Sequence, residues 1–104
     1  MSEKQYLIMF DLDTRKRHYH KTEVGRIIAF MVQLEIKVGN IWKEVIRFDC
    51  VHDFTHKDCY NIDGEQRKVI LYLDYDEALT IADDDLNENW QYYREIFLRG
   101  DFPC

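Results

Sequence analysis

The sequence contains little proline, glycine and cysteine: one Pro, four Gly and three Cys among 104 residues. So few chain-breaking residues argue against a disordered, collagen-like or low-complexity chain. Three cysteines, an odd number without a Cys-x-x-Cys motif, argue against a secreted disulfide scaffold. We therefore expect free thiols at Cys50, Cys59 and Cys104, and a reducing, cytoplasmic environment.

Long apolar runs and familiar enzyme motifs are also missing. No stretch approaches the roughly 18 to 20 apolar residues that a membrane helix needs. The polar start, Met1-Ser2-Glu3-Lys4, is followed by too short an apolar run for a signal peptide. The sequence has no Gly-x-Gly-x-x-Gly, P-loop, Gly-x-Ser-x-Gly or His-Glu-x-x-His motif. We expect no membrane association and no nucleotide-binding fold.

Aromatic and acidic residues, in contrast, are abundant. Two Trp, seven Tyr and six Phe can form a dense core, and 104 residues leave room for one domain only. The net charge is −6, and residues 53–104 carry thirteen Asp and Glu against five Lys and Arg. Because phosphate neutralisation requires a basic surface, this balance disfavours nucleic acid as the main partner.

Alternating apolar and polar residues predict five β-strands. The predicted strands cover residues 5–13, 25–38, 41–51, 54–62 and 66–73. The basic stretch over 14–23 contains His18 and His20, and we interpret it as a solvated connector or the polar continuation of a hairpin. A metal site at the two histidines, or an RNA contact, is the alternative for this stretch.

The register of the hairpin around Gly39-Asn40 can be predicted from its side chains. A three-residue loop over 38–40 pairs Val32 with Ile46, whereas a two-residue loop places Val32 opposite Arg47. We prefer the three-residue loop because it matches apolar with apolar residues. It also places Arg47 and Asp49 on the face of the sheet that lies away from the main core.

The last segment predicts a long helix over 75–99, with Asp74 as its N-cap. Its apolar residues recur every three or four positions: Leu79, Ala82, Leu86, Trp90, Tyr93 and Phe97. We expect the consecutive Asp83, Asp84 and Asp85 to form a solvated face. Strands followed by one helix predict an α+β fold, an antiparallel sheet of five to six strands with the helix on one face.

The densest polar segment spans residues 47–59. Arg47 and Asp49 lie two apart on one predicted strand, and His56 and Asp58 lie two apart on the next, so each pair shares a face. If the two strands are antiparallel neighbours, the four side chains cluster, with His52 at the bend. These five residues are the candidate catalytic or binding site.

Three interpretations of this site stay open. The first is a buried polar network that fixes the hairpin. The second is a catalytic site in which His52 or His56 acts as a general base, an Asp orients it and Arg47 binds an anion. The third is a metal site built from His52, His56 and Asp49 or Asp58, although His-x-x-x-His spacing suits a helix better than a loop and a strand. We expect no cofactor, and leave a divalent metal at His52 and His56 open as the alternative.

Several motifs resemble a family of short prokaryotic proteins known only as a domain of unknown function. The motifs are F-M-V-Q-L-E (30–35), I-R-F-D (46–49), His52, H-K-D (56–58), E-A-L-T (77–80) and N-E-N-W (87–90). The resemblance spans about residues 18–97, with Phe48 and Lys57 replacing the usual Tyr and Arg. It implies the α+β fold and the same five site residues, and no activity.

Residues 46–58 are also similar to the TumE family of prokaryotic toxin–antitoxin proteins. That resemblance implies a small toxin that acts on RNA and is neutralised by a partner protein. The acidic composition favours a different function, a binding or protein-interaction module. We expect a homodimer or a protein partner on the second face of the sheet, where Ile27, Ala29, Met31 and Val45 lie among polar residues.

Overall fold

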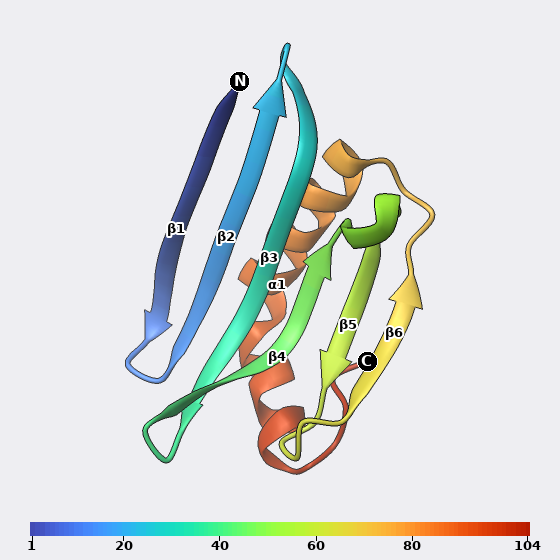
Figure 1. Cartoon of the computed structure of the whole chain (residues 1–104). Helices are drawn as coiled ribbons and strands as arrows, with labels where there is room; N and C mark the ends of the chain where they lie inside the picture. The colour runs from blue at the N-terminus through green and yellow to red at the C-terminus, as the bar shows by residue number, and fades with distance from the viewer.

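Six antiparallel strands form one sheet in the order in which they occur in the chain (Figure 1). The strands are β1 (Ser2–Asp11), β2 (Thr14–Glu23), β3 (Arg26–Val38), β4 (Ile41–Asp49), β5 (His56–Tyr60) and β6 (Gln66–Ile70). One helix, α1 (Tyr75–Leu98), follows them. This computed structural model describes all 104 residues, and it confirms the predicted α+β fold.

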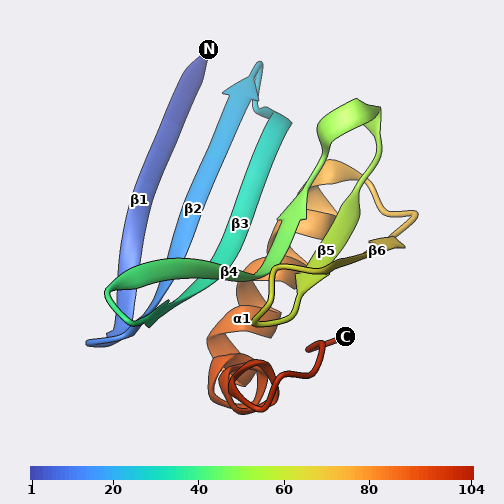
Figure 2. The same ribbon diagram turned by 60° about the horizontal axis from the view of Figure 1, so that its bottom comes forward.

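The helix α1 packs on one face of the sheet, mainly against β3 and β4 (Figures 1 and 2). We call this the helix face and the opposite side the open face. The helix begins where predicted because the Asp74 carboxylate accepts a hydrogen bond from the Glu77 backbone N–H at 2.9 Å. The core lies between helix and sheet, and its fully buried members include Val32, Leu34, Ile46, Phe48, Ala82, Leu86 and Phe97. No helix is apolar over the length that would span a membrane.

The basic stretch over 14–23 is the strand β2, which forms a hairpin with β1; the hairpin alternative is therefore confirmed, and the solvated connector is wrong. It pairs with β1 on one side and β3 on the other. Lys16 and His18 lie on the helix face and are only 2% exposed. Lys16 donates hydrogen bonds from Nζ to Asp83 Oδ1 at 3.0 Å and to Asn87 Oδ1 at 2.8 Å. The pairing of Asp83 with buried cations also corrects the expectation that it belongs to a solvated face.

The β3–β4 hairpin has a different register from the predicted one. Val38 pairs with Ile41 across a two-residue turn, Gly39-Asn40, in which both residues have positive φ. A bulge in β4 then shifts the register, so that Leu34 pairs with Ile46. The predicted three-residue loop is therefore wrong. The bulge adds one residue to β4, so apolar residues of the two strands pair with each other even though the turn has only two residues.

The bulge also changes the expected apolar surface of the sheet. Val45 is fully buried in the core, and Ile27 packs against the core. The open face is instead largely polar around Glu35, whose carboxylate accepts hydrogen bonds from Arg15, Arg17 and Gln33 at 2.6 to 3.0 Å. Burial opposes ionisation there, but these hydrogen bonds hold the pKa of Glu35 below its ordinary value. Ile27 and Val45 therefore do not belong to the predicted partner surface, whereas a partner on this face stays a prediction.

Cys59 and Cys104 form a disulfide that joins the C-terminal tail to β5. The tail lies along the end of the sheet because Pro103 is buried and the Arg67 guanidinium stacks 4.0 Å from the Phe102 ring centroid. The prediction of free thiols is wrong for this pair. Cys50 is the free cysteine.

Candidate functional site

The antiparallel pairing of β4 with β5 brings four of the five candidate residues together. Arg47 pairs with Asp58, and Asp49 pairs with His56. Partners in an antiparallel pair point to the same side of a sheet, and here that side is the open face. The alternation of side chains along two short strands is therefore sufficient to assemble the group.

The imidazole of His56 lies between two carboxylates. His56 Nε2 lies 2.6 Å from Asp49 Oδ1 and 3.4 Å from Asp58 Oδ2. The other ring nitrogen, Nδ1, lies 3.4 Å from the carbonyl oxygen of Phe54. We call Asp49, His56 and Asp58 the Asp/His cluster.

Two basic side chains lie at the rim of the cluster. Arg47 Nε is 3.5 Å from Asp49 Oδ2, and Arg47 Nη1 is 3.9 Å from Glu44 Oε1. Lys68 Nζ lies 3.9 Å from Asp58 Oδ1, beyond hydrogen-bond distance. The rim is partly open to solvent, since the side chains of Arg47 and Lys68 are 35% and 43% exposed.

The cluster itself is buried. The side chain of His56 is 2% exposed, and those of Asp49 and Asp58 are 7% exposed. Buried carboxylates destabilise a fold unless they are paired, and Asp58 Oδ1 is buried without a hydrogen-bond partner. Chemically, the arrangement can exchange a proton between imidazole and carboxylate, or offer three ligand atoms to a cation.

His52 lies at the bend between β4 and β5, as predicted, but its side chain is not part of the Asp/His cluster. It is exposed on a short 3₁₀ turn, Val51–Asp53, and its ring faces that of Phe54 at 6.5 Å. Both His52 and Asp53 have positive φ, which is uncommon for residues other than glycine. The group of side chains close enough to share a metal ion contains His56 with Asp49 and Asp58, and not His52.

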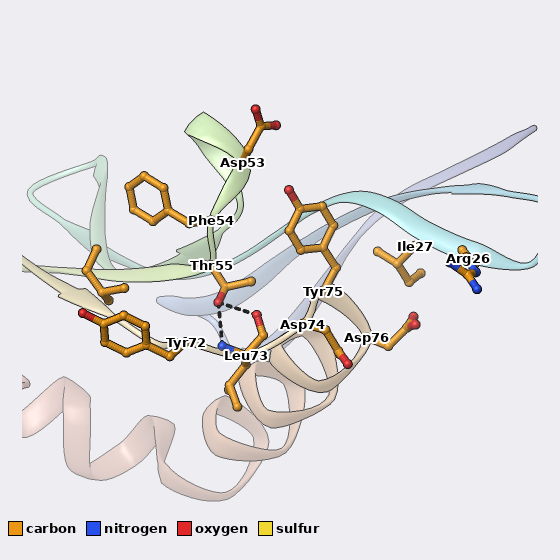
Figure 3. A pocket seen from close by; sticks show the side chains of 11 residues that line it. Arg26, Ile27, Asp53, Phe54, Thr55, Tyr72, Leu73, Asp74, Tyr75 and Asp76 are labelled. Atoms are coloured by element: carbon orange, nitrogen blue, oxygen red, sulfur yellow. Dashed lines mark hydrogen bonds between the residues drawn. The ribbon is translucent and has the colours of Figure 1, made fainter.

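A cavity of about 1000 Å³ opens at the end of the sheet near the start of α1 (Figure 3). Its wall comes from four parts of the chain: Arg26, Ile27, Asp53, Phe54, Thr55, Ile70, Tyr72, Leu73, Asp74, Tyr75 and Asp76. Thr55 fixes the β6–α1 connection by donating from its hydroxyl to the Leu73 carbonyl at 2.9 Å (Figure 3). The sequence gives no sign of this cavity, because its lining residues come together only in the folded chain.

The cavity and the Asp/His cluster are neighbours separated by side chains. Phe54 lines the cavity, and its ring centroid lies 5.4 Å from that of His56. Ile70 also lines the cavity and is the β6 partner of His56. None of Arg47, Asp49, His56 and Asp58 lines the cavity, so a ligand held there would not contact the cluster directly.

A second polar network lies on the helix face, between β2 and α1. His18 Nδ1 is 3.4 Å from Asp83 Oδ1, and His18 Nε2 is 2.7 Å from His20 Nδ1. Tyr6 covers the His18 ring with a stacked centroid distance of 4.5 Å. Burial lowers the pKa of His18 below its ordinary value, and the charge of Asp83 opposes this shift. The predicted solvated surface at His18 is therefore an internal contact between sheet and helix.

Comparison with known proteins identifies one family. The model of a family described as Domain of unknown function (DUF7718) matches residues 1–103. No curated protein and no solved structure matches the chain. The prediction that the chain belongs to a family of unknown function is thereby confirmed, whereas the motifs, the prokaryotic origin and the similarity to the TumE family stay predictions.

Proposed function

The chain belongs to the family described as Domain of unknown function (DUF7718), and we propose from its structure that it is a protein-interaction module that pairs with a second copy of itself through β1. The observation that carries this proposal is the free edge of β1. This strand is ten residues long and lies at the outer edge of the sheet (Figure 1). Its outward backbone N–H and C=O groups are available to another strand.

The side chains of β1 are exposed along most of the strand, including four consecutive large apolar ones. Their exposed fractions are 42% for Tyr6, 45% for Leu7, 39% for Ile8 and 53% for Met9. The opposite edge of the sheet is β6, which has only five residues and carries Arg67 and Lys68. Short, charged edge strands oppose pairing, whereas a long apolar edge favours it. The two edges therefore differ in the way expected if β1 alone is an interface.

The sequence of β1 suits pairing with its own copy. When a two-fold axis relates two copies, their β1 strands run antiparallel, and the same face of each sheet lies on the same side. A register centred on Ile8 pairs Ile8 with itself and Leu7 with Met9, so that apolar residues meet on both faces. A register centred on Leu7 would instead oppose Glu3 and Asp11.

The test is the oligomeric state of the full chain, measured by sedimentation velocity with Cys50→Ser in every protein compared, so that no free thiol crosslinks two copies and the Cys59–Cys104 disulfide stays intact. We expect a dimer for the wild type and a monomer for Leu7→Lys, since a lysine on an edge strand opposes strand pairing. Val69→Lys is the matched control, because Val69 is 41% exposed on the other edge strand. A monomeric wild type, or a Leu7→Lys variant that stays dimeric, would refute the proposal.

A second candidate function, action on RNA, rests on the convergence of Arg47, Asp49, His56 and Asp58 on the open face. An imidazole beside carboxylates can act as a general base, and Arg47 at the rim can bind a phosphate. The burial of His56 favours the interaction module, because a polymer would have to displace the rim to reach the ring. On this second hypothesis, expression of the wild type arrests growth and His56→Ala relieves the arrest; normal growth with the wild type argues against it.

A further inference from the structure

We infer that the Asp/His cluster is a binding site for one divalent transition-metal ion, ligated by Asp49, His56 and Asp58. Each of these buried residues offers one ligand atom, and the three atoms lie within 4.8 Å of one another. This inference is independent of the proposed pairing through β1, because the cluster lies on β4 and β5.

The distances between the ligand atoms suit one small ion. Two atoms that are each about 2.1 Å from a tetrahedral ion lie about 3.4 Å apart. His56 Nε2 is 2.6 Å from the Asp49 oxygen and 3.4 Å from the Asp58 oxygen. Small changes in side-chain torsion angles therefore suffice to place the three atoms around an ion, and both strands hold their backbones in position by pairing with each other.

The charges at the cluster provide a second argument. Asp58 is 93% buried at its side chain, and its Oδ1 has no hydrogen-bond partner. Lys68 lies 3.9 Å from this oxygen, and Arg47 Nε is itself buried without a hydrogen bond. A divalent cation bound by the Asp58 carboxylate would balance both buried carboxylates, and rotation of that carboxylate would present the unpaired Oδ1 to the ion. Arg47 could then turn toward Glu44, which already lies 3.9 Å from its guanidinium.

The chemistry of the ligands indicates the class of metal. Mg²⁺ and Ca²⁺ take oxygen ligands, whereas imidazole nitrogen suits Zn²⁺ and its neighbours in the first transition series. One imidazole and two carboxylates make three protein ligands, so a fourth position stays available to water. We therefore assign the site to the Zn²⁺ class and not to Mg²⁺ or Ca²⁺.

The experiment is a calorimetric titration of the full-length protein with Zn²⁺, repeated with Mg²⁺. We expect one Zn²⁺ per chain and no binding of Mg²⁺ in the same range. Asp58→Asn and His56→Gln should each weaken Zn²⁺ binding at least about tenfold, because a neutral amide is a weaker ligand than a carboxylate or an imidazole. His52→Gln and Asp53→Asn are matched controls on the adjacent exposed turn, and they should bind Zn²⁺ like the wild type.

Two further measurements keep the test decisive. A Co²⁺ absorption spectrum should lack the intense charge-transfer band of a thiolate ligand, which excludes binding at Cys50. Circular dichroism identifies variants that fail to fold; should His56→Gln be one of these, the nearly isosteric Asp58→Asn decides. The inference is overturned if the wild type binds no stoichiometric Zn²⁺, if a folded Asp58→Asn binds it unchanged, or if the thiolate band appears.

Discussion

At the scale of single residues, the buried polar side chains make different contributions on the two faces of the sheet. On the helix face, Lys16 and His18 contact Asp83, so sheet and helix are joined through charge as well as through apolar packing. On the open face, His56 contacts two acidic residues of its own hairpin. The first network therefore fixes the helix to the sheet, whereas the second holds β4 against β5.

The position of His18 predicts a pH dependence of folding. Its pKa is lowered in the folded protein by burial, so the unfolded chain binds a proton more readily. The contribution of His18 to stability is therefore present above the ordinary histidine pKa and is lost as the pH falls below it. Urea unfolding at pH 7.5 and at about pH 5 should show that acidification lowers the free energy of unfolding less for His18→Gln than for the wild type.

The exposed His52 provides the control for this pH dependence, because His52→Gln should lose as much stability on acidification as the wild type does. The groups around His18 are unchanged in both variants, namely Tyr6, Lys16, His20 and Asp83. Equal losses in all three proteins would contradict the assignment of the effect to His18.

At the scale of elements, the apolar periodicity was sufficient to predict the helix and most strands. β3 and α1 were predicted within one or two residues, because each presents a regular apolar pattern to the core. For the strand β2 the sequence left two alternatives open, a connector or a hairpin, because its inward side chains are Thr14, Lys16 and His18. These inward side chains alternate regularly, but they are polar. Their burial depends on Asp83 of the helix, which is 67 positions away from Lys16 in the sequence.

The part of the candidate site that lies on strands could also be predicted from the alternation of side chains. Alternation along two neighbouring strands placed Arg47, Asp49, His56 and Asp58 on one face, and the structure brings them together there. His52 lies at the predicted bend, but its side chain stays outside the cluster, on a turn with positive φ at non-glycine residues. Such a conformation is set by tertiary contacts, and neither residue type nor spacing indicates it.

At the scale of the whole molecule, α1 covers one face of the sheet, whereas the edge of β1 and the open face are left uncovered by the helix. The helix α1 packs against β3 and β4, and the disulfide joins the C-terminal tail to β5, whereas β1 stands at the far edge of the sheet (Figure 2). The proposed self-pairing through β1 and the proposed metal site therefore occupy different regions of the sheet. Changes at one should leave the other intact, so Leu7→Lys should bind Zn²⁺ as the wild type does.

The disulfide between Cys59 and Cys104 predicts how stability responds to reduction. It joins residues 45 positions apart. Closing a loop of that length lowers the entropy of the unfolded chain, which raises the free energy of unfolding by up to about 4 kcal/mol. Urea unfolding of the wild type should shift to a lower midpoint when a thiol reductant is added, and Cys104→Ser should show the lower midpoint with or without it. Cys50→Ser should respond to reductant like the wild type, because Cys50 is outside the bridge. Equal midpoints for the oxidised and reduced wild type would mean that the tail adds nothing to the stability of the sheet.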